Sequence, residues 1–251
     1  MTTSSAALPL FYSRPVPMNP QRHGAYSLDA KPHYSFAQAS NALPLNVAEF
    51  APACHDYPIV FASNPGQAEP MPVAVVGLRD KSNLFVDAKG QWTAGVYVPA
   101  YVRRFPFIFL EQPESDTLTL MVDEAAAVVT ESAANPFFRG DETTDLTRNA
   151  LEFCKEYHLH AQLTQRFVQA LVKADVLLEN RADVTIATGE KLSLTGFLRV
   201  DEARLQALPA ATIADWHREG WLAPVYAHLL SISRLGKLVD AEAFTHTQGN
   251  A

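Results

Sequence analysis

The feature that most restricts the fold of this chain is the uneven distribution of its prolines. Fourteen of the 17 prolines lie before residue 114 of the 251-residue sequence. Proline has no backbone N–H to donate, and its ring clashes with the preceding helical turn, so it is disfavoured inside helices and central strands. The first half of the chain is therefore expected to form short strands, turns and irregular loops rather than long helices.

Short apolar runs in this half are typical of buried strands. Runs rich in β-branched and aromatic residues, bounded by turn residues, predict strands. They lie at Tyr57–Phe61, Pro72–Leu78, Asn83–Ala88, Gln91–Ala94, Ile108–Glu111 and Leu118–Asp123. Lys89-Gly90, between the third and fourth runs, predicts a hairpin with a glycine turn. Asn46 is expected to cap a short helix at 47–51, which Pro52 would end.

The second half of the chain changes to a helical period. Between Asp145 and Asp175 the apolar side chains recur mostly every three or four residues, which indicates one long amphipathic helix. Further along, the sequence predicts a strand and then three helices. They lie at Leu192–Val200, Asp201–Leu208, Thr212–Glu219 and Trp221–Leu238.

The two halves together predict an α+β fold. We expect a mainly antiparallel sheet from the N-terminal half, covered by helices from the C-terminal half. The expected single domain spans residues 1–251, with a β-rich, proline-rich half at 1–123 and a helical half at 143–240. The stretch 124–142 between them is either a linker or a loop over one shared core.

Charge and hydropathy exclude several classes of partner. The net charge is −7, divided into +2 for residues 1–110 and −9 for residues 111–251. Neither half is basic enough to gather phosphates, so we expect no nucleic-acid partner. No apolar run approaches the roughly 20 residues that span a bilayer, and the N-terminus lacks the basic start of a signal peptide. We therefore expect no membrane insertion and a cytoplasmic protein.

Standard motifs for catalysis, metals and cofactors are missing from the sequence. The glycines match neither the dinucleotide-binding spacing nor the phosphate-loop spacing. Cys154 and His158 share one helix face while His160 points away from it, which leaves a zinc site incomplete. Cys54 and His55 are adjacent, and neighbours on a strand point to opposite faces. We expect no catalytic residue, no metal and no cofactor, and the sequence favours a protein that is not an enzyme.

The densest group of unusual side chains lies at 92–109, which we call the aromatic–arginine segment. Its prominent members are Trp92, Tyr97, Tyr101, Arg103 and Arg104. Arginine beside aromatic rings can bind carboxylates, phosphates, flat rings or peptides, and both residue types dominate interaction hot spots. The alternative is a packing junction, in which the rings fill the core and the arginines lie over rings or cap carbonyl groups.

Five stretches of the chain, in their order and spacing, resemble the SapC family of bacterial proteins. They are YPIVF at 57–61, VVGLRDKSNLFVDAKGQW at 75–92, YVPAYVRRFPF at 97–107, TGFLRVDEARLQALP at 195–209 and LLSISRLGKL at 229–238. The resemblance covers nearly the whole chain and departs from the family pattern at 135–142, where NPFFRGDE replaces a glycine-led segment. It makes Tyr57, Trp92, Tyr97, Arg103 and Arg104 motif positions and assigns no catalytic residue.

The resemblance implies an accessory role. Members of the family are often encoded near flavin-dependent tryptophan-halogenase-like proteins, cupin-like proteins and outer-membrane receptors. We therefore expect a cytoplasmic accessory protein that captures a partner protein, a peptide or a small anionic ligand. The residues expected to hold it are Arg103, Arg104, Trp92, Tyr97, Tyr101 and Tyr57.

Two alternatives stay open. One is an enzyme without a standard motif that acts with a halogenase-like or cupin-like oxygenase system. It would be favoured by His23, His55 or His158 meeting a carboxylate in one deep pocket. The other is a surface-layer component, the association from which the family name derives.

Overall fold

The main sheet of the protein is five-stranded and antiparallel throughout. The computed structural model describes residues 8–29, 31, 33–63, 69–112, 115–185 and 189–248. The strand order is β11-β12-β4-β5-β3. These strands are β3 (Ala42–Pro44), β4 (Ile59–Ala62), β5 (Met71–Val75), β11 (Leu177–Thr185) and β12 (Lys191–Val200). The C-terminal half thus supplies two of the five strands, beside the three from the N-terminal half.

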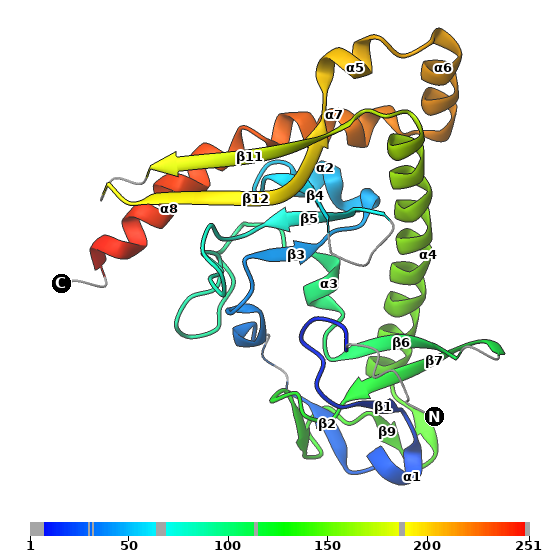
Figure 1. Ribbon diagram of the computed structural model, residues 1–251. Coiled ribbons are helices and arrows are strands. Elements are labelled where there is room, and N and C mark those ends of the chain that lie inside the picture. Colours follow the sequence, from blue (N-terminus) through cyan, green and yellow to red (C-terminus); the bar gives the residue numbers. More distant parts are fainter. Residues whose placement is uncertain are drawn as a thin grey trace, which may run out of the picture.

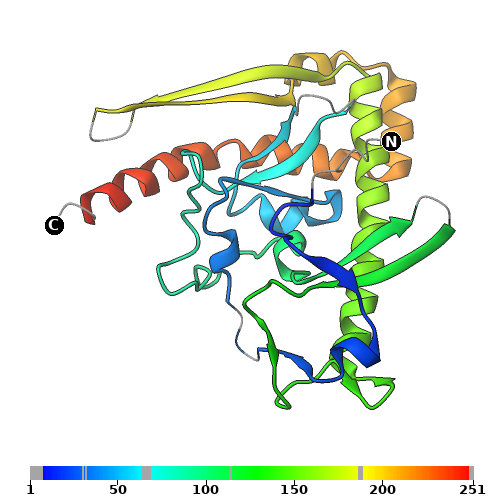
Figure 2. The ribbon, with the colours of Figure 1, turned by 60° about the horizontal axis from the view of Figure 1, so that its bottom comes forward.

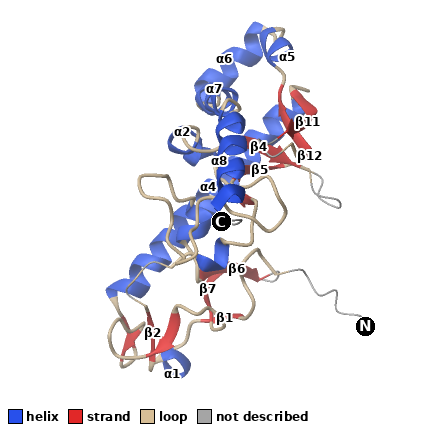
Figure 3. Cartoon of the chain, turned by 90° about the vertical axis from the view of Figure 1, so that its left-hand side faces the viewer, coloured by secondary structure: helices blue, strands red, loops and turns tan. Residues whose placement is uncertain are grey.

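A second antiparallel sheet has the order β1-β7-β6. Its strands are β1 (Pro15–Pro17), β6 (Phe107–Gln112) and β7 (Ser115–Asp123). Two smaller pairs accompany it, β2 (Tyr26–Leu28) with β8 (Val129–Glu131) and β9 (Phe138–Arg139) with β10 (Glu142–Thr143). Figures 1 and 3 show this sheet near the start of helix α4 (Asp145–Lys173), with the five-stranded sheet toward the other end of that helix.

Helix α4 is 29 residues long and forms because its apolar residues repeat with the helical period. Its buried side chains are Thr147, Cys154, Thr164, Phe167, Val168 and Leu171. Phe167 packs edge-on against Phe50, with ring centroids 5.8 Å apart. The Phe167 ring centroid also lies 6.5 Å from that of Phe61 in β4, and Cys154 belongs to one buried cluster with Phe107 of β6. Helix α4 thus packs beside both sheets (Figure 1).

The remaining helices are short, except for the last three. They are α1 (Pro20–His23), η1 (Ser35–Ala37), η2 (Val47–Glu49), α2 (Phe50–Ala53), α3 (Ala100–Arg103), α5 (Glu202–Gln206), α6 (Ala210–Glu219), α7 (Leu222–Ser231) and α8 (Arg234–Gln248). Helix α8 runs beside the β11–β12 hairpin, as Figures 1 and 2 both show. Leu238 of α8 and Phe197 of β12 belong to one buried cluster there.

The largest buried cluster draws on both halves of the sequence. Leu43, Phe50 and Tyr57 from the first half pack in it with Phe167 and Val225 from the second. We propose on this ground that the chain forms one domain. The stretch 124–142 carries β8, β9 and the first residue of β10, and its Phe137 is fully buried, so it is a packed loop rather than a free linker.

His228 fixes helix α7 to the five-stranded sheet. Its imidazole is fully buried, accepts a hydrogen bond from the Val200 N–H at Nε2 (3.0 Å) and donates from Nδ1 to the Ile59 carbonyl (2.8 Å). The Ser231 hydroxyl accepts a further bond from the Ile59 N–H (2.9 Å). Strands β12 and β4 are thus connected to one face of α7 by polar side chains.

The α+β class is confirmed, and the expected strands at β4, β5, β6, β7 and β12 are present. The expected strands at 83–88 and 91–94 are wrong, because these stretches form turns and pair only in the single bridge Val86–Trp92. The Asp87 carboxylate accepts hydrogen bonds from the N–H groups of Lys89 and Gln91, both at 2.8 Å, and so turns the backbone locally. The glycine turn itself is present, with Gly90 at a φ of +72°.

The expected continuous helix at 221–238 is also wrong. It is divided into α7 and α8, which end at Ser231 and begin at Arg234. The hydroxyls of Ser231 and Ser233 donate to the carbonyls of His228 (2.6 Å) and Leu230 (2.8 Å). Serine hydroxyls that bond to backbone carbonyls in this way often bend helices, which accounts for the interruption.

Candidate binding site

Three of the six expected site residues lie in the protein interior. The exposed fractions are 0% for Tyr57, 6% for Tyr101 and 9% for Trp92. The Tyr57 hydroxyl donates to the carbonyl of Tyr97, and the Tyr101 hydroxyl donates to the carbonyl of Leu10 (2.9 Å). These rings therefore shape the aromatic–arginine segment from inside.

Arg104 lies between aromatic rings rather than against a carboxylate. Its guanidinium carbon is 4.2 Å from the ring centroids of both Tyr101 and Tyr157, and 5.7 Å from that of Tyr12. Its Nε is buried and has no hydrogen-bond partner in the described part of the chain. Such stacking is a cation–π interaction that strengthens when water is excluded. Arg104 thus joins α3 to α4 and to the N-terminal segment.

Arg103 directly precedes Arg104 in the sequence, and its side chain points outward and is exposed. Its Nε donates to the Val98 carbonyl (3.0 Å), and its Nη2 donates to the Tyr97 hydroxyl (3.3 Å). Its guanidinium also lies over the rings of Tyr97 and Phe153, at 5.8 Å and 5.1 Å from their centroids. No carboxylate of the described residues forms an ion pair with it. The guanidinium is thus held in place by a carbonyl group, a hydroxyl group and two aromatic rings.

A small cavity of about 170 Å³ opens beside Arg103. We call it the Arg103 pocket, and its polar and aromatic lining is Glu49, Tyr97, Arg103, Phe153, Glu156, Tyr157 and His160. The segment 97–103 forms one wall and helix α4 forms the other. The structure thus brings Arg103 and Tyr97 together at one surface, and leaves Arg104, Trp92, Tyr57 and Tyr101 behind it.

Glu49 supports this pocket rather than serving as a free acid. Its side chain accepts hydrogen bonds from the Tyr97 hydroxyl (3.0 Å), the Ala100 N–H (2.6 Å) and the Asn46 N–H (2.9 Å). Burial, with the Glu49 charge as the next cause, raises the pKa of Tyr97 to about 12. Tyr97 therefore stays protonated near neutral pH and fixes both Glu49 and Arg103.

The neighbouring face of α4 carries exposed apolar and charged groups. Leu159 is 62% exposed and lies one helical turn after Glu156, and Leu163 is 36% exposed one turn further on.

Sequence reasoning missed Glu49, Phe153, Glu156 and His160 as residues of the site. Only the helical period of α4 places the last three on adjoining turns, and nothing in the local sequence indicates that they face Arg103.

Of the three histidines whose contact with a carboxylate would favour an enzyme, His23 makes such a contact. His23 is fully buried and lies 3.1 Å from Glu124, whose side chain is itself only 4% exposed. His55 is exposed on a separate turn, and His158 contacts Gln162 within α4. In the described residues no group of three His, Cys, Asp or Glu side chains is arranged to hold a metal ion.

Neither cysteine is a ready nucleophile. Burial raises the pKa of Cys154 to about 11 and also raises that of Cys54. A thiol attacks as its thiolate, which such a shift disfavours near neutral pH.

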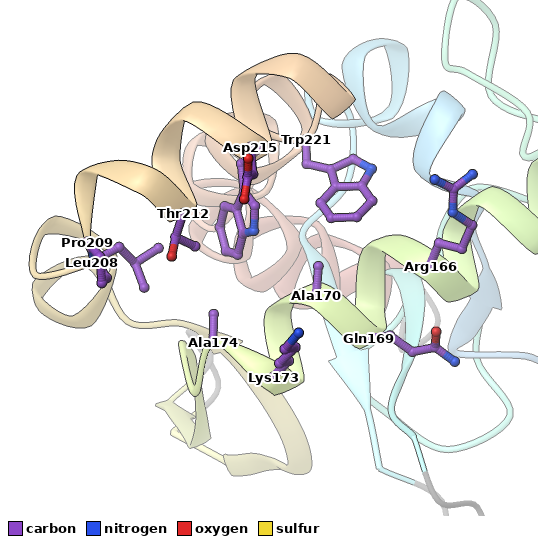
Figure 4. Close-up of a pocket in the computed structure, with 11 residues that line it drawn as sticks. Arg166, Gln169, Ala170, Lys173, Ala174, Leu208, Pro209, Thr212, Asp215 and Trp221 are labelled. Carbon is purple, nitrogen blue, oxygen red and sulfur yellow. The ribbon is translucent and has the colours of Figure 1, made fainter.

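A larger cavity of about 620 Å³ lies elsewhere, between α4, α6 and the turn before α7 (Figure 4). Its lining includes Trp216 and Trp221 and no residue of the aromatic–arginine segment. None of the helices in the described ranges is both long and apolar enough to cross a membrane.

Comparison with known proteins gives one match. The family model for SapC matches residues 18–238, which include the whole of the Arg103 pocket and the large cavity. Searches of curated proteins and of solved structures give no match. Because the family model covers most of the 251 residues, the chain belongs to the SapC family.

Proposed function

We propose that this protein is an accessory binding protein that captures a carboxylate-bearing segment of a partner protein at the Arg103 pocket. The observation that carries the proposal is the exposed guanidinium of Arg103, fixed by Val98 and Tyr97 and not neutralised by any described carboxylate. A guanidinium matches the geometry of a carboxylate with two parallel hydrogen bonds. Fixing it before binding reduces the side-chain entropy lost on capture.

The surroundings of Arg103 favour a protein segment over a free small anion. The pocket is small, at about 170 Å³, while exposed Leu159 and Leu163 extend the surface along α4. Exposed apolar groups beside a charged anchor are typical of protein contacts. Glu156 on the same wall would attract a positively charged group of the partner, next to the partner's carboxylate at Arg103. A partner segment that carries both charges therefore fits best.

The other residues expected at the site support this surface from behind. In our proposal Arg104, Tyr57, Trp92 and Tyr101 hold the shape of the segment, and Arg103 with Tyr97 contacts the partner. We also propose that the protein acts in the cytoplasm, which fractionation of the source cells tests. Recovery of the protein in the cell envelope would instead favour the surface-layer role.

Site-specific photo-crosslinking tests the proposed surface. A benzophenone amino acid at Leu159 should crosslink a partner in a lysate of the source organism, and Arg103→Ala should abolish that product. The same crosslinker at Leu230, 70% exposed on α7, is the matched control and should not capture the same partner. A product that persists in the Arg103→Ala variant would contradict the proposal.

A further inference from the structure

The cavity between α4, α6 and the turn before α7 has the form of a small-molecule site. Its volume of about 620 Å³ is within the range of known ligand pockets, which is roughly 300–1,000 Å³. We call it the tryptophan pocket, and the residues used below are Arg166, Gln169, Lys173, Thr212, Trp216 and Trp221. Arg166, Gln169 and Lys173 lie near the end of α4, as Figure 4 shows. Thr212 and Trp216 belong to α6, and Trp221 lies in the turn before α7.

The turn between α6 and α7 explains why two indoles line one cavity. Gly220 ends α6 with a φ of +79°, a left-handed conformation that glycine adopts without strain. The chain then reverses, and the Trp221 N–H donates to the Trp216 carbonyl (2.8 Å). Trp216 is buried, and the half-buried Trp221 ring packs against Phe167 with centroids 6.4 Å apart. Two rigid aromatic surfaces are thereby fixed.

Small residues on α4 keep the space in front of these rings open. Ala170 and Ala174 line the same cavity, and Figure 4 shows Ala170 across from the Trp221 indole. Aromatic rings prefer offset or edge contacts with another ring, with centroids about 4.5–7 Å apart. A flat apolar body therefore fits the space that the two alanines leave.

The charges at the mouth of the pocket favour an anion. The exposed ammonium group of Lys173 has no ion-pair partner in the described residues, and Arg166 shares its charge with Glu219 at 3.1 Å. Asp215 is the acid in the lining, and it is already paired with Arg218 at 2.5 Å. Lys173 is thus the charge that a ligand can meet.

We propose that the tryptophan pocket binds a small molecule with a flat aromatic body and a carboxylate group. The ring lies against Trp216 and Trp221, and the carboxylate faces Lys173 and Arg166. Gln169 and Thr212 also line the cavity and supply polar groups. This site is formed by the last turns of α4, whereas the Arg103 pocket uses an earlier part of the helix, so either proposal can fail without the other.

Calorimetric titration with 2-naphthoate and its neutral analogue 2-naphthamide tests the charge requirement. The carboxylate should bind about three- to fivefold more tightly than the amide, as expected for one partly exposed ion pair. Lys173→Gln should remove that preference, and Lys173→Arg should restore it. Lys155→Gln is the matched control, because Lys155 is on the same helix but paired with Glu152 at 2.7 Å.

A second variant tests the cavity itself. Ala170→Leu fills the space before Trp221 with a good helix former and should weaken binding of both probes at least about tenfold, with an unchanged far-UV spectrum. The proposal is overturned if 2-naphthoate shows no binding up to about 1 mM, because a dissociation constant above that value describes only a very weak complex. It is also overturned if the amide binds equally well or if the filled variant binds as the wild type does.

Discussion

The indole nitrogen of Trp92 donates a hydrogen bond of 3.1 Å to the hydroxyl oxygen of Tyr57. The same hydroxyl donates onward to the carbonyl of Tyr97, so three of the expected site residues form one chain of hydrogen bonds. Tyr97 in turn lies against Arg103. The buried aromatic residues therefore fix the position of Arg103, whose side chain is exposed.

Replacing Tyr57 by phenylalanine should destabilise the protein. The change leaves the Trp92 N–H and the Tyr97 carbonyl without their partner, which costs about 1–3 kcal/mol in the free energy of unfolding. Urea unfolding measures it. Tyr226→Phe is the control, because Tyr226 is 55% exposed and its hydroxyl should contribute little. Equal unfolding midpoints for the two variants would show that the buried hydroxyl does not stabilise the fold.

His228 predicts a loss of stability in mild acid. Burial lowers its pKa from 6.5 to about 4, because a charged imidazole would lose its hydration there. Between these two values the unfolded chain binds a proton that the folded chain does not. The free energy of unfolding should therefore fall as pH drops from about 6.5 to about 4, by about 3 kcal/mol at most.

The variant His228→Gln separates this effect from other titrations. Glutamine does not titrate, so the variant should be less stable at neutral pH but should show a shallower loss over the same pH range. Denaturant unfolding at a series of pH values measures both slopes. Parallel slopes for wild type and variant would show that His228 is not the titrating group.

Two glycines should respond to alanine in opposite directions. A Cβ at Gly77 would lie 1.8 Å from the Ser82 carbonyl oxygen, so Gly77→Ala must displace backbone and should cost about 2 kcal/mol or more. Gly236 in α8 has no heavy atom within 4 Å of such a Cβ among the described residues. Gly236→Ala should stabilise the protein by about 0.5–1 kcal/mol. Thermal unfolding of both variants checks the sign, and a stable Gly77→Ala variant would refute the close approach.

The local pattern of apolar residues was sufficient to predict the helices and strands in which these residues repeat regularly. The repeat of apolar residues predicts α4, and the runs around Ile59 and Val73 predict two adjacent strands. Strand β11 was missed because its polar residues, as in Glu179 and Asn180, do not form an apolar run. It is stabilised by pairing with β12, which is a tertiary interaction.

The candidate site was only partly predictable for the same reason. The sequence singles out Arg103 and Arg104 together, but successive residues on a helical turn point in different directions. One reaches the solvent, and the other lies against Tyr157, which is more than 50 residues later in the chain. The closing of the pocket by α4 depends on that long-range packing.

Comparing Arg103→Ala with Arg104→Ala in one experiment tests the central claim most directly. Unfolding by urea and capture of the partner crosslinked at Leu159 are measured for each variant. We predict that Arg103→Ala loses capture with an unchanged free energy of unfolding. Arg104→Ala should lose about 1–3 kcal/mol of that free energy, because its cation–π contacts are partly desolvated. Retained capture by Arg103→Ala, or an unfolded Arg103→Ala variant beside a stable Arg104→Ala variant, would contradict the account.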